Sequence, residues 1–202
     1  MASNFGKTIQ VSTFGASHGY AIGGIVEGLP CGHTIDIDEL QAFLKRRAPG
    51  QNQLQTQRKE ADIPEFLSGM VDGMLSGSPL AFMIRNTSQH SGDYNNLRDI
   101  PRPSHADFTA RMRYGDKVDM RGGGHFSARL TAPLCVAGGI ALQLLREKGI
   151  EIHGHLKQVG TIQDTPIDMV HPDMKALAKI ATETIAMVDA DKRPEVENLV
   201  MK

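Results

Sequence analysis

The apolar and polar positions alternate over the first thirty residues in two short segments. Residues 8–14 (Thr-Ile-Gln-Val-Ser-Thr-Phe) alternate and are rich in β-branched side chains, which predicts a strand. Residues 22–29 predict a second strand, closed by Pro30. Residues 67–86 predict two more short strands around a Gly-Ser-Pro turn at 77–79. We therefore expect a sheet built from neighbouring strands with tight connections.

Helical periodicity follows Asp36, which has Glu39 three residues later, as in a capping box with aspartate in place of Ser or Thr. One helical face then carries Leu40, Phe43 and Leu44, and the pattern stops at Pro49. A longer helix is predicted over 131–148, with basic residues in its last turn and Gly149 as its stop.

The C-terminal third predicts a strand over 150–156 and a helix over 174–187, and Pro194 opens a further helical pattern. Two segments resemble loops: 50–62, which is polar, and 87–127, which has few apolar residues and little periodicity. A loop as long as the second is unusual in a compact domain and is often functional. Mixed strands and helices in this order predict an α+β fold.

The bulk composition excludes several classes of protein. A chain of 202 residues with net charge −1 has no general field that would attract nucleic acid or a membrane surface. The longest apolar stretch, 132–145, is short for a membrane span, and no signal-peptide pattern opens the chain. Cys31 and Cys135 lack metal-ligand spacing and form no disulfide framework. We expect a soluble, cytoplasmic protein without a metal site.

The run 121–131 (Arg-Gly-Gly-Gly-His-Phe-Ser-Ala-Arg-Leu-Thr) carries the strongest chemical signal. Three consecutive glycines let backbone N–H groups converge on one anion, and the predicted helix start adds positive charge there. Arg121 and Arg129 flank the glycines with guanidinium groups suited to phosphate or carboxylate. Between Arg98 and Arg129 there are seven Lys or Arg against four Asp. The pattern predicts a site for an acidic small molecule.

Two histidines lie in short loops bounded by glycine or proline. His18 follows the first strand, and His105 lies within the segment Arg-Pro-Ser-His-Ala-Asp at 102–107. Imidazole exchanges protons near neutral pH, although a loop histidine is also commonly a surface hydrogen-bonding residue. Asp107 could orient the His105 ring or cap the next segment. Ser17 beside His18 does not indicate a serine hydrolase, because neighbours rarely point at each other and no nucleophile-elbow motif surrounds them.

Together these segments resemble the chorismate synthase family. Their order and spacing follow that family from the first residue to about residue 155, and the combination is far more specific than any one piece. The matching segments are 14–19 (Phe-Gly-Ala-Ser-His-Gly), 28–32 (Gly-Leu-Pro-Cys-Gly), 46–50 (Arg-Arg-Ala-Pro-Gly), 67–69 (Leu-Ser-Gly), 84–87 (Ile-Arg-Asn-Thr), 93–94 (Asp-Tyr), 102–107, 114–115 (Tyr-Gly) and 121–131.

The resemblance implies a lyase that eliminates phosphate from 5-enolpyruvylshikimate 3-phosphate in a 1,4-elimination, giving chorismate for aromatic amino acid biosynthesis by the shikimate pathway. It implies reduced FMN as cofactor, with NADPH as a candidate reductant, and a homotetramer. The implied fold is a layered β-α-β sandwich, partial here, with residues 1–202 as one domain that is incomplete at the C-terminus. This agrees with the residues, since the substrate and FMN both bring phosphate to a site rich in arginine and glycine.

The resemblance also assigns roles to individual residues. His18 and His105 match the two catalytic histidines of the family, with His105 assigned to the flavin. Arg47 matches a residue that contacts both substrate and nucleotide. Ser17 and Arg129 match substrate-contacting positions, and the cofactor-contacting segment is His125, Phe126 and Ser127. For Arg46 and Arg121 a structural role is an equal alternative.

Some positions depart from the family pattern. Ala16 replaces a glutamate beside His18, and Gln53 replaces a residue that is commonly basic. Ser104 replaces a glycine before His105; if its φ is positive, serine strains the loop by about 1–3 kcal/mol. Family members also run far beyond residue 202, and the portion that follows carries further FMN contacts. The alternative is therefore a non-catalytic remnant that binds an anion or flavin, or only associates with other subunits.

Overall fold

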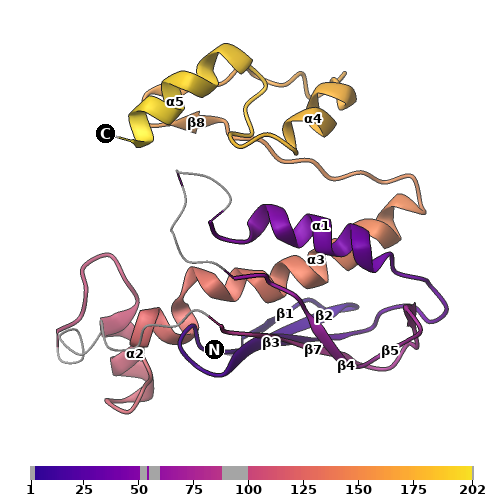
Figure 1. Ribbon diagram of the computed structural model, residues 1–202, viewed down its shortest axis with the longest axis vertical. Helices are drawn as coiled ribbons and strands as arrows, with labels where there is room; N and C mark the ends of the chain where they lie inside the picture. Colours follow the sequence, from indigo (N-terminus) through magenta and orange to yellow (C-terminus); the bar gives the residue numbers. More distant parts are fainter. Residues whose placement is uncertain (1–2, 51–53, 55–59, 88–99, 202) are drawn as a thin grey trace.

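The protein has three layers in the computed structural model, which describes all residues except 1–2, 51–53, 55–59, 88–99 and 202. An antiparallel sheet forms one outer layer, two long helices cover one of its faces, and the C-terminal segments form a third layer beyond the helices (Figure 1). The two chain ends lie at opposite sides of this stack.

The main sheet has five strands in the order β1-β2-β3-β7-β4, with every neighbouring pair antiparallel. Both N-terminal strands predicted from alternation are present. The predicted two strands over 67–86 prove to be four, because two very short strands form a separate hairpin. The strands are β1 (Asn4–Phe5), β2 (Gln10–Gly15), β3 (Ala21–Glu27), β4 (Glu65–Ser68), β5 (Met70–Val71), β6 (Met74–Leu75) and β7 (Leu80–Arg85).

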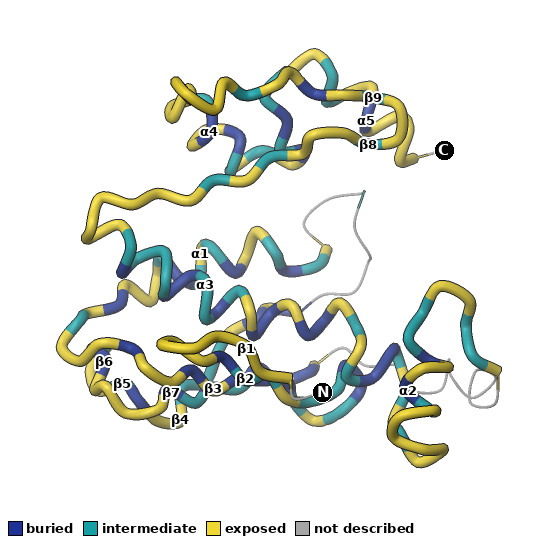
Figure 2. The backbone as a smooth tube through the Cα atoms, turned by 180° about the vertical axis from the view of Figure 1, so that it is seen from behind, coloured by how far each residue is buried: buried dark blue, intermediate teal, exposed yellow. Residues whose placement is uncertain are grey.

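The core lies between the sheet and the helices, where Figure 2 shows the buried backbone of both layers. Alternate residues of β3 and β7 point to the helices and are almost fully buried, as expected for a sheet with one covered face. From the sheet these residues are Ile22, Val26, Leu80, Phe82 and Ile84, and from the helices they are Leu40, Leu44, Val136 and Ile140.

The first helix, α1 (Ile37–Arg47), begins as predicted, since the Asp36 carboxylate accepts a hydrogen bond from Glu39 N at 2.9 Å. The reciprocal half of the capping box is not formed. The Glu39 carboxylate instead pairs with Arg146, with 2.7 and 2.9 Å between oxygen and nitrogen atoms. The Asp36 N–H donates to the Gln143 side chain at 2.8 Å. The start of α1 is therefore capped partly by α3 (Thr131–Arg146).

The glycine run precedes the predicted helix start at residue 131, which is confirmed. It folds as two 3-10 segments, η2 (Arg121–Phe126) and η3 (Ala128–Leu130), before α3 begins at Thr131. The helix dipole therefore does not act at the glycines themselves. By length and hydropathy the whole stretch Arg121–Arg146 could cross a membrane, but half of it is buried, and a core helix passes the same test.

The largest difference from the sequence-based expectations is α2 (Asp107–Tyr114), which lies inside the segment predicted as a loop over 87–127. Its apolar side chains Phe108, Met112 and Tyr114 are exposed, so the helix has no apolar stripe that periodicity could detect. Residues 88–99 of the same segment lie outside the described residues.

The C-terminal layer also differs from the prediction. The predicted strand over 150–156 is extended chain without a ladder: Ile150 N donates to Leu145 O at 3.0 Å, and Leu156 N donates to Ala186 O at 2.7 Å. The predicted helix over 174–187 ends early, at Ile180. The layer contains β8 (Gln158–Val159), β9 (Ile162–Gln163), α4 (Met174–Ile180), η4 (Ala190–Lys192) and α5 (Arg193–Val200), around a small apolar cluster of Ile185, Met187 and Val196.

Candidate functional site

The turn that carries His18 connects β2 to β3 and is closed by a hydrogen bond from Gly19 N to Ala16 O at 2.9 Å. Both Ser17 and His18 are buried, with relative exposures of 0% and 6%. Buried polar side chains in a hairpin turn need a second element to cover them. Here the second element is the glycine run.

Hydrogen bonds tie the turn to the glycine run. Ser17 N donates to Gly124 O at 3.0 Å, and the Ser17 hydroxyl donates to Gly122 O at 2.8 Å. Gly122, Gly123 and Gly124 have φ values of 57°, 87° and 55°, a conformation that glycine adopts without steric cost. A left-handed glycine turn therefore lies directly against the His18 loop.

The two predicted catalytic histidines contact consecutive glycines of this turn. A Cβ on Gly122 would lie 2.0 Å from Nδ1 and Cε1 of His18. A Cβ on Gly123 would lie 3.0 Å from Nε2 of His105. The glycines are therefore required by close approach as well as by backbone conformation. The structure brings together His18, His105 and the glycine run, which are far apart in the sequence.

Ser17 and His18 do contact each other, contrary to the expectation for neighbouring residues. Ser17 Oγ and His18 Nδ1 are 3.2 Å apart. Because the hydroxyl hydrogen is given to Gly122 O, the oxygen can accept from Nδ1–H, which places the lone pair of the neutral ring on Nε2. Ser17 is fully buried and bonded to the glycine run, so its position suits a brace for His18 and not a hydrolase nucleophile.

His105 is oriented by an ion pair. Its Nδ1 lies 2.5 Å from Asp107 Oδ1, and Arg102 binds the same carboxylate with Nε at 2.8 Å and Nη2 at 2.9 Å. The Arg102 side chain holds the pKa of Asp107 well below its usual value, and its backbone N–H and His105 act in the same direction. Ser104 has φ +58°, so the condition for strain at this position is met.

Both nitrogens of the His125 ring are occupied by protein groups. Nδ1 lies 2.9 Å from Gly15 O, and Nε2 lies 2.5 Å from Ser3 Oγ. The side chain therefore fastens the glycine run to β2. Phe126 is 38% exposed and packs on Tyr114, and Ser127 Oγ accepts from Arg129 N at 3.3 Å. Because the side chains of His125 and Ser127 already bind protein groups, Phe126 and the backbone of residues 125–127 are the groups of this predicted cofactor segment that can contact a ligand.

Arg47 and Arg129 share one carboxylate. Asp62 accepts from Arg47 Nη1 at 2.6 Å through one oxygen and from Arg129 Nη1 through the other. Arg129 is only 5% exposed, and its Nη2 has no hydrogen-bond partner among the described residues, with Glu60 Oε2 3.9 Å away. Both predicted substrate arginines thus lie in one cluster whose charge is largely balanced by Asp62 and Glu60.

Asn86 connects this arginine cluster to the His18 turn. Its Nδ2 donates to Ala16 O at 3.1 Å and to Gly19 O at 2.8 Å, and its Oδ1 accepts from Arg129 Nε at 3.2 Å. The sequence analysis gave no role to Asn86, Asp62 or Glu60. One signal was present: an arginine that is buried needs a carboxylate, and the polar segment 50–62 contains two, Glu60 and Asp62.

Arg46 and Arg121 bind other protein groups, which favours the structural alternative for both. Arg46 Nη1 donates to Ala181 O at 2.6 Å, which joins α1 to the C-terminal layer. Arg121 forms an exposed pair with Asp119 at 2.8 Å, and this hydrogen bond lowers the pKa of Asp119 and raises that of Arg121. Within the described part of the chain, no group of three His, Cys, Asp or Glu side chains could hold a metal ion.

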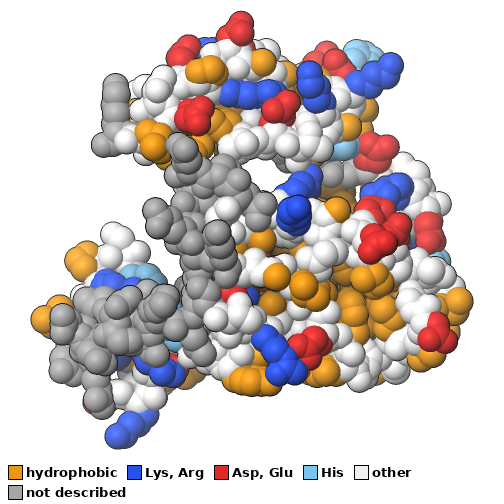
Figure 3. All heavy atoms as spheres, viewed as in Figure 1, with side chains coloured by type: hydrophobic (Ala, Val, Ile, Leu, Met, Phe, Trp, Pro, Cys, Tyr) orange, Lys and Arg blue, Asp and Glu red, His pale blue; other side chains and the backbone are white. Residues whose placement is uncertain are grey.

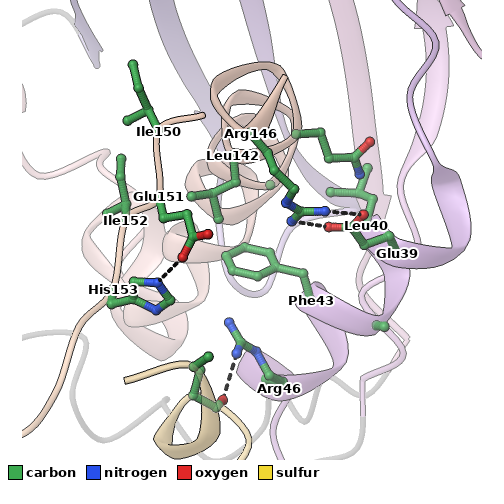
Figure 4. Close-up of a pocket in the computed structure, with 15 residues that line it drawn as sticks. Glu39, Leu40, Phe43, Arg46, Leu142, Arg146, Ile150, Glu151, Ile152 and His153 are labelled. Atoms are coloured by element: carbon green, nitrogen blue, oxygen red, sulfur yellow. Dashed lines mark hydrogen bonds and ion pairs between the residues drawn. The ribbon is translucent and has the colours of Figure 1, made fainter. Parts of the chain in front are cut away.

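One hollow of the surface lies elsewhere. Figure 3 shows it between the C-terminal layer and the helices, and its volume is about 450 Å³. Phe43 and Leu142 line it, and its charged groups are already paired, as in Glu39 with Arg146 and Glu151 with His153 (Figure 4). None of the predicted site residues lines this hollow, so size alone does not identify the functional site.

Comparison with known proteins agrees with the geometry. The family profile described as chorismate synthase matches residues 9–202, nearly the whole chain. The chain belongs to the chorismate synthase family. Chorismate synthase of Lancefieldella parvula is 45% identical over 191 residues, which cover 94% of this chain and 50% of that protein. Chorismate synthase of Bacteroides thetaiotaomicron is 44% identical over 202 residues, which cover 100% of this chain and 55% of that protein.

The fold agrees as well. A crystal structure of chorismate synthase superimposes with a TM-score of 0.68 at 23% identity, and the match covers 96% of this chain and 52% of that one. The predicted α+β class of chorismate synthase type is therefore confirmed. The chain spans about half the length of the curated relatives that it matches.

Proposed function

We propose that this chain carries the histidine side of a chorismate synthase active site, which eliminates phosphate from 5-enolpyruvylshikimate 3-phosphate to give chorismate. The observation that supports the proposal most directly is the packing of His18 and His105 against Gly122 and Gly123. Two proton-carrying rings beside an open backbone turn suit a reaction that expels a phosphate and moves a proton.

The two histidines have different surroundings, which suits different roles. His18 is braced by Ser17 through Nδ1, so its Nε2 is the atom that would take up a second proton and pass it to the leaving phosphate. His105 is braced by Asp107 through Nδ1, so its Nε2, which faces Gly123, would hold a proton on the cofactor side. In both cases a hydrogen bond at Nδ1 orients the ring and directs proton transfer to Nε2.

Reduced FMN fits the chemistry of this site. The glycine turn carries no side chains, so the rings of His18 and His105 can lie against its backbone, and Phe126 offers an exposed aromatic face in the same segment. We propose that Phe126, Ser127 and the backbone of His125 hold the flavin together with Arg47. When bound, reduced FMN would supply electron density to the breaking C–O bond and accept the departing hydrogen.

The arginine cluster suits the carboxylates and phosphates of the substrate. Arg47 is partly exposed, whereas Arg129 is buried and keeps one nitrogen without a hydrogen-bond partner in the described residues. We assign substrate contact first to Arg47, with Arg129 and Ser17 behind it as the groups that fix the shape of the site. NADPH as reductant, assembly as a homotetramer, a cytoplasmic location and a single domain over 1–202 belong to the same proposal.

The alternative is a non-catalytic remnant that binds an anion or flavin, or only associates with other subunits. One observation favours it: Ala16 lacks the carboxylate that the family pattern has beside the histidine. The backbone strain at Ser104 also favours the non-catalytic remnant.

Two measurements separate these readings. FMN is mixed with the purified chain under reducing conditions and retained flavin is measured by absorbance after gel filtration. Phosphate release from 5-enolpyruvylshikimate 3-phosphate is then followed with the parent chain and with His105→Ala. Retained flavin with phosphate release that H105A abolishes supports the enzyme. A folded chain that neither retains flavin nor releases phosphate supports the remnant.

A further inference from the structure

Asn86 has an unusual position for a residue outside the proposed catalytic set. It follows the end of β7 directly, it is only 8% exposed, and its side chain reaches both ends of the turn that carries His18. Its backbone N–H also donates to Tyr20 O at 3.1 Å, just after that turn. Asn86 therefore contacts the polypeptide on both sides of His18.

The side-chain amide has one orientation that satisfies its neighbours. Nδ2 carries two hydrogens and meets two carbonyl oxygens, Ala16 O at 3.1 Å and Gly19 O at 2.8 Å, while Oδ1 meets the Nε–H of Arg129. A flipped amide would place an oxygen against two carbonyls and a nitrogen donor against a guanidinium. Donor and acceptor chemistry thus assigns the orientation.

We infer that Asn86 is a positioning residue for His18, and that it holds the His18 turn in register with Arg129. The inference rests on the proposed function of His18. The two Nδ2 hydrogen bonds fix the carbonyls of Ala16 and Gly19, and residues 17 and 18 lie between these carbonyls. Fixing both ends of so short a turn fixes the direction of the imidazole, which rests on Gly122. Asn86 acts through the turn and contacts neither the proposed substrate nor the cofactor.

The substitution Asn86→Asp tests this effect. Aspartate has the same shape and keeps an oxygen for Arg129 Nε, but it replaces the Nδ2 donor with an oxygen that faces two carbonyls. It also adds a negative charge beside the guanidinium of Arg129. Ile84→Val is the matched control, because Ile84 is a buried residue of the same strand whose trimming weakens packing without touching the amide.

The decisive readout is the tautomer of the His18 ring, measured from its ring ¹⁵N NMR signals, which are assigned with His18→Gln. We expect one neutral tautomer, with Nδ1 protonated, in the parent chain and in I84V. In N86D we expect signals averaged between both tautomers. If N86D melts at a lower temperature but keeps the parent ring signals, Asn86 is merely structural and the inference is overturned. If N86D does not fold, Asn86→Ser is measured with the same two outcomes.

This measurement needs no turnover, so the inference can fail or stand separately from the proposed function. Where phosphate release is measurable, N86D should lower kcat by about tenfold or more with a smaller effect on KM, since misplacing a catalytic group costs rate. Equal kcat in N86D and the parent, with the parent active, would also overturn the inference. Absence of turnover in the parent counts against the proposed function alone, and the ring signals still decide the role of Asn86.

Discussion

The imidazole of His105 and the carboxylate of Asp107 lie 2.5 Å apart, and Arg102 binds both oxygens of that carboxylate. The Asp107 side chain is buried, and the hydrogen bonds from Arg102 keep its pKa well below the ordinary 3.8. A carboxyl group with a depressed pKa stabilises the fold above its ordinary pKa. That stabilisation is lost as the pH falls below about 4 towards the folded pKa.

Asp107→Asn should therefore remove a charge-assisted contact. We expect a loss of about 1–3 kcal/mol in the free energy of unfolding at pH 7. The difference between parent and variant should shrink as the pH is lowered from 4 towards 2. Urea unfolding at a series of pH values measures both quantities. A difference that stays constant over that range would show that the Asp107 charge is not stabilising.

Gly122→Ala should disrupt the site far more than an ordinary glycine substitution. The new Cβ would lie 2.0 Å from the His18 ring, and the residue would keep a φ of 57°. We expect destabilisation of at least about 1–2 kcal/mol from the backbone conformation alone, together with loss of any flavin or phosphate binding.

Gly138→Ala is the matched control for Gly122→Ala. Gly138 lies inside α3, and a Cβ there would meet nothing within 4 Å. Alanine should stabilise the helix by about 0.5–1 kcal/mol. Thermal unfolding of the two variants should thus shift in opposite directions, and shifts in the same direction would contradict the account of the glycine turn.

Asp62→Asn should destabilise the protein strongly, because it removes the charge that balances two arginines. Asp62 has φ +50°, a conformation that asparagine tolerates, so the backbone is not the cause of any loss. Removing one partner of a buried ion pair costs about 3–5 kcal/mol. Chemical denaturation measures the effect. Glu65→Gln breaks an exposed pair with Arg85 and should change stability little, which makes it the comparison.

Ser104→Gly should stabilise the loop that carries His105. Serine pays about 1–2 kcal/mol to hold a left-handed conformation, and glycine does not. Glycine also has more conformational freedom in the unfolded chain, which offsets about 0.4–1 kcal/mol of the stabilisation. We expect a small rise in the melting temperature. A fall would show that Ser104 makes a contribution that outweighs its backbone strain.

Parts of the site could be predicted because single residue types carry a direct physical meaning. Three glycines in succession predict a backbone that an anion can approach, and in the structure the groups that approach it are the rings of His18 and His105. Asp36 predicted the start of α1 in the same way, because its side chain accepts a hydrogen bond from the backbone of the first helical turn. Local chemistry of this kind can be read without knowing the fold.

Other parts could not be predicted, because they depend on contacts between distant segments. Asp62 ends a segment predicted as a loop, and Asn86 ends a segment predicted as strands. Both are buried only because β7 and the segment after α1 pack against the glycine run. From the sequence, the Glu39 carboxylate could cap α1 or pair with a side chain of α3. It pairs with Arg146 because the two helices pack side by side. α2 was missed because a helix with exposed apolar residues shows no stripe.

The contact between His125 and Ser3 has a practical consequence for handling the protein. Ser3 Oγ is fastened to the glycine run, and Ser3 O also accepts from Thr13 N at 2.8 Å. An affinity tag fused just before Ser3 would therefore disturb the position of the glycine run. The other terminus lies beyond the helices, on the far side of the stack (Figure 1). A label is therefore better attached to the exposed residues of α5 than next to Ser3.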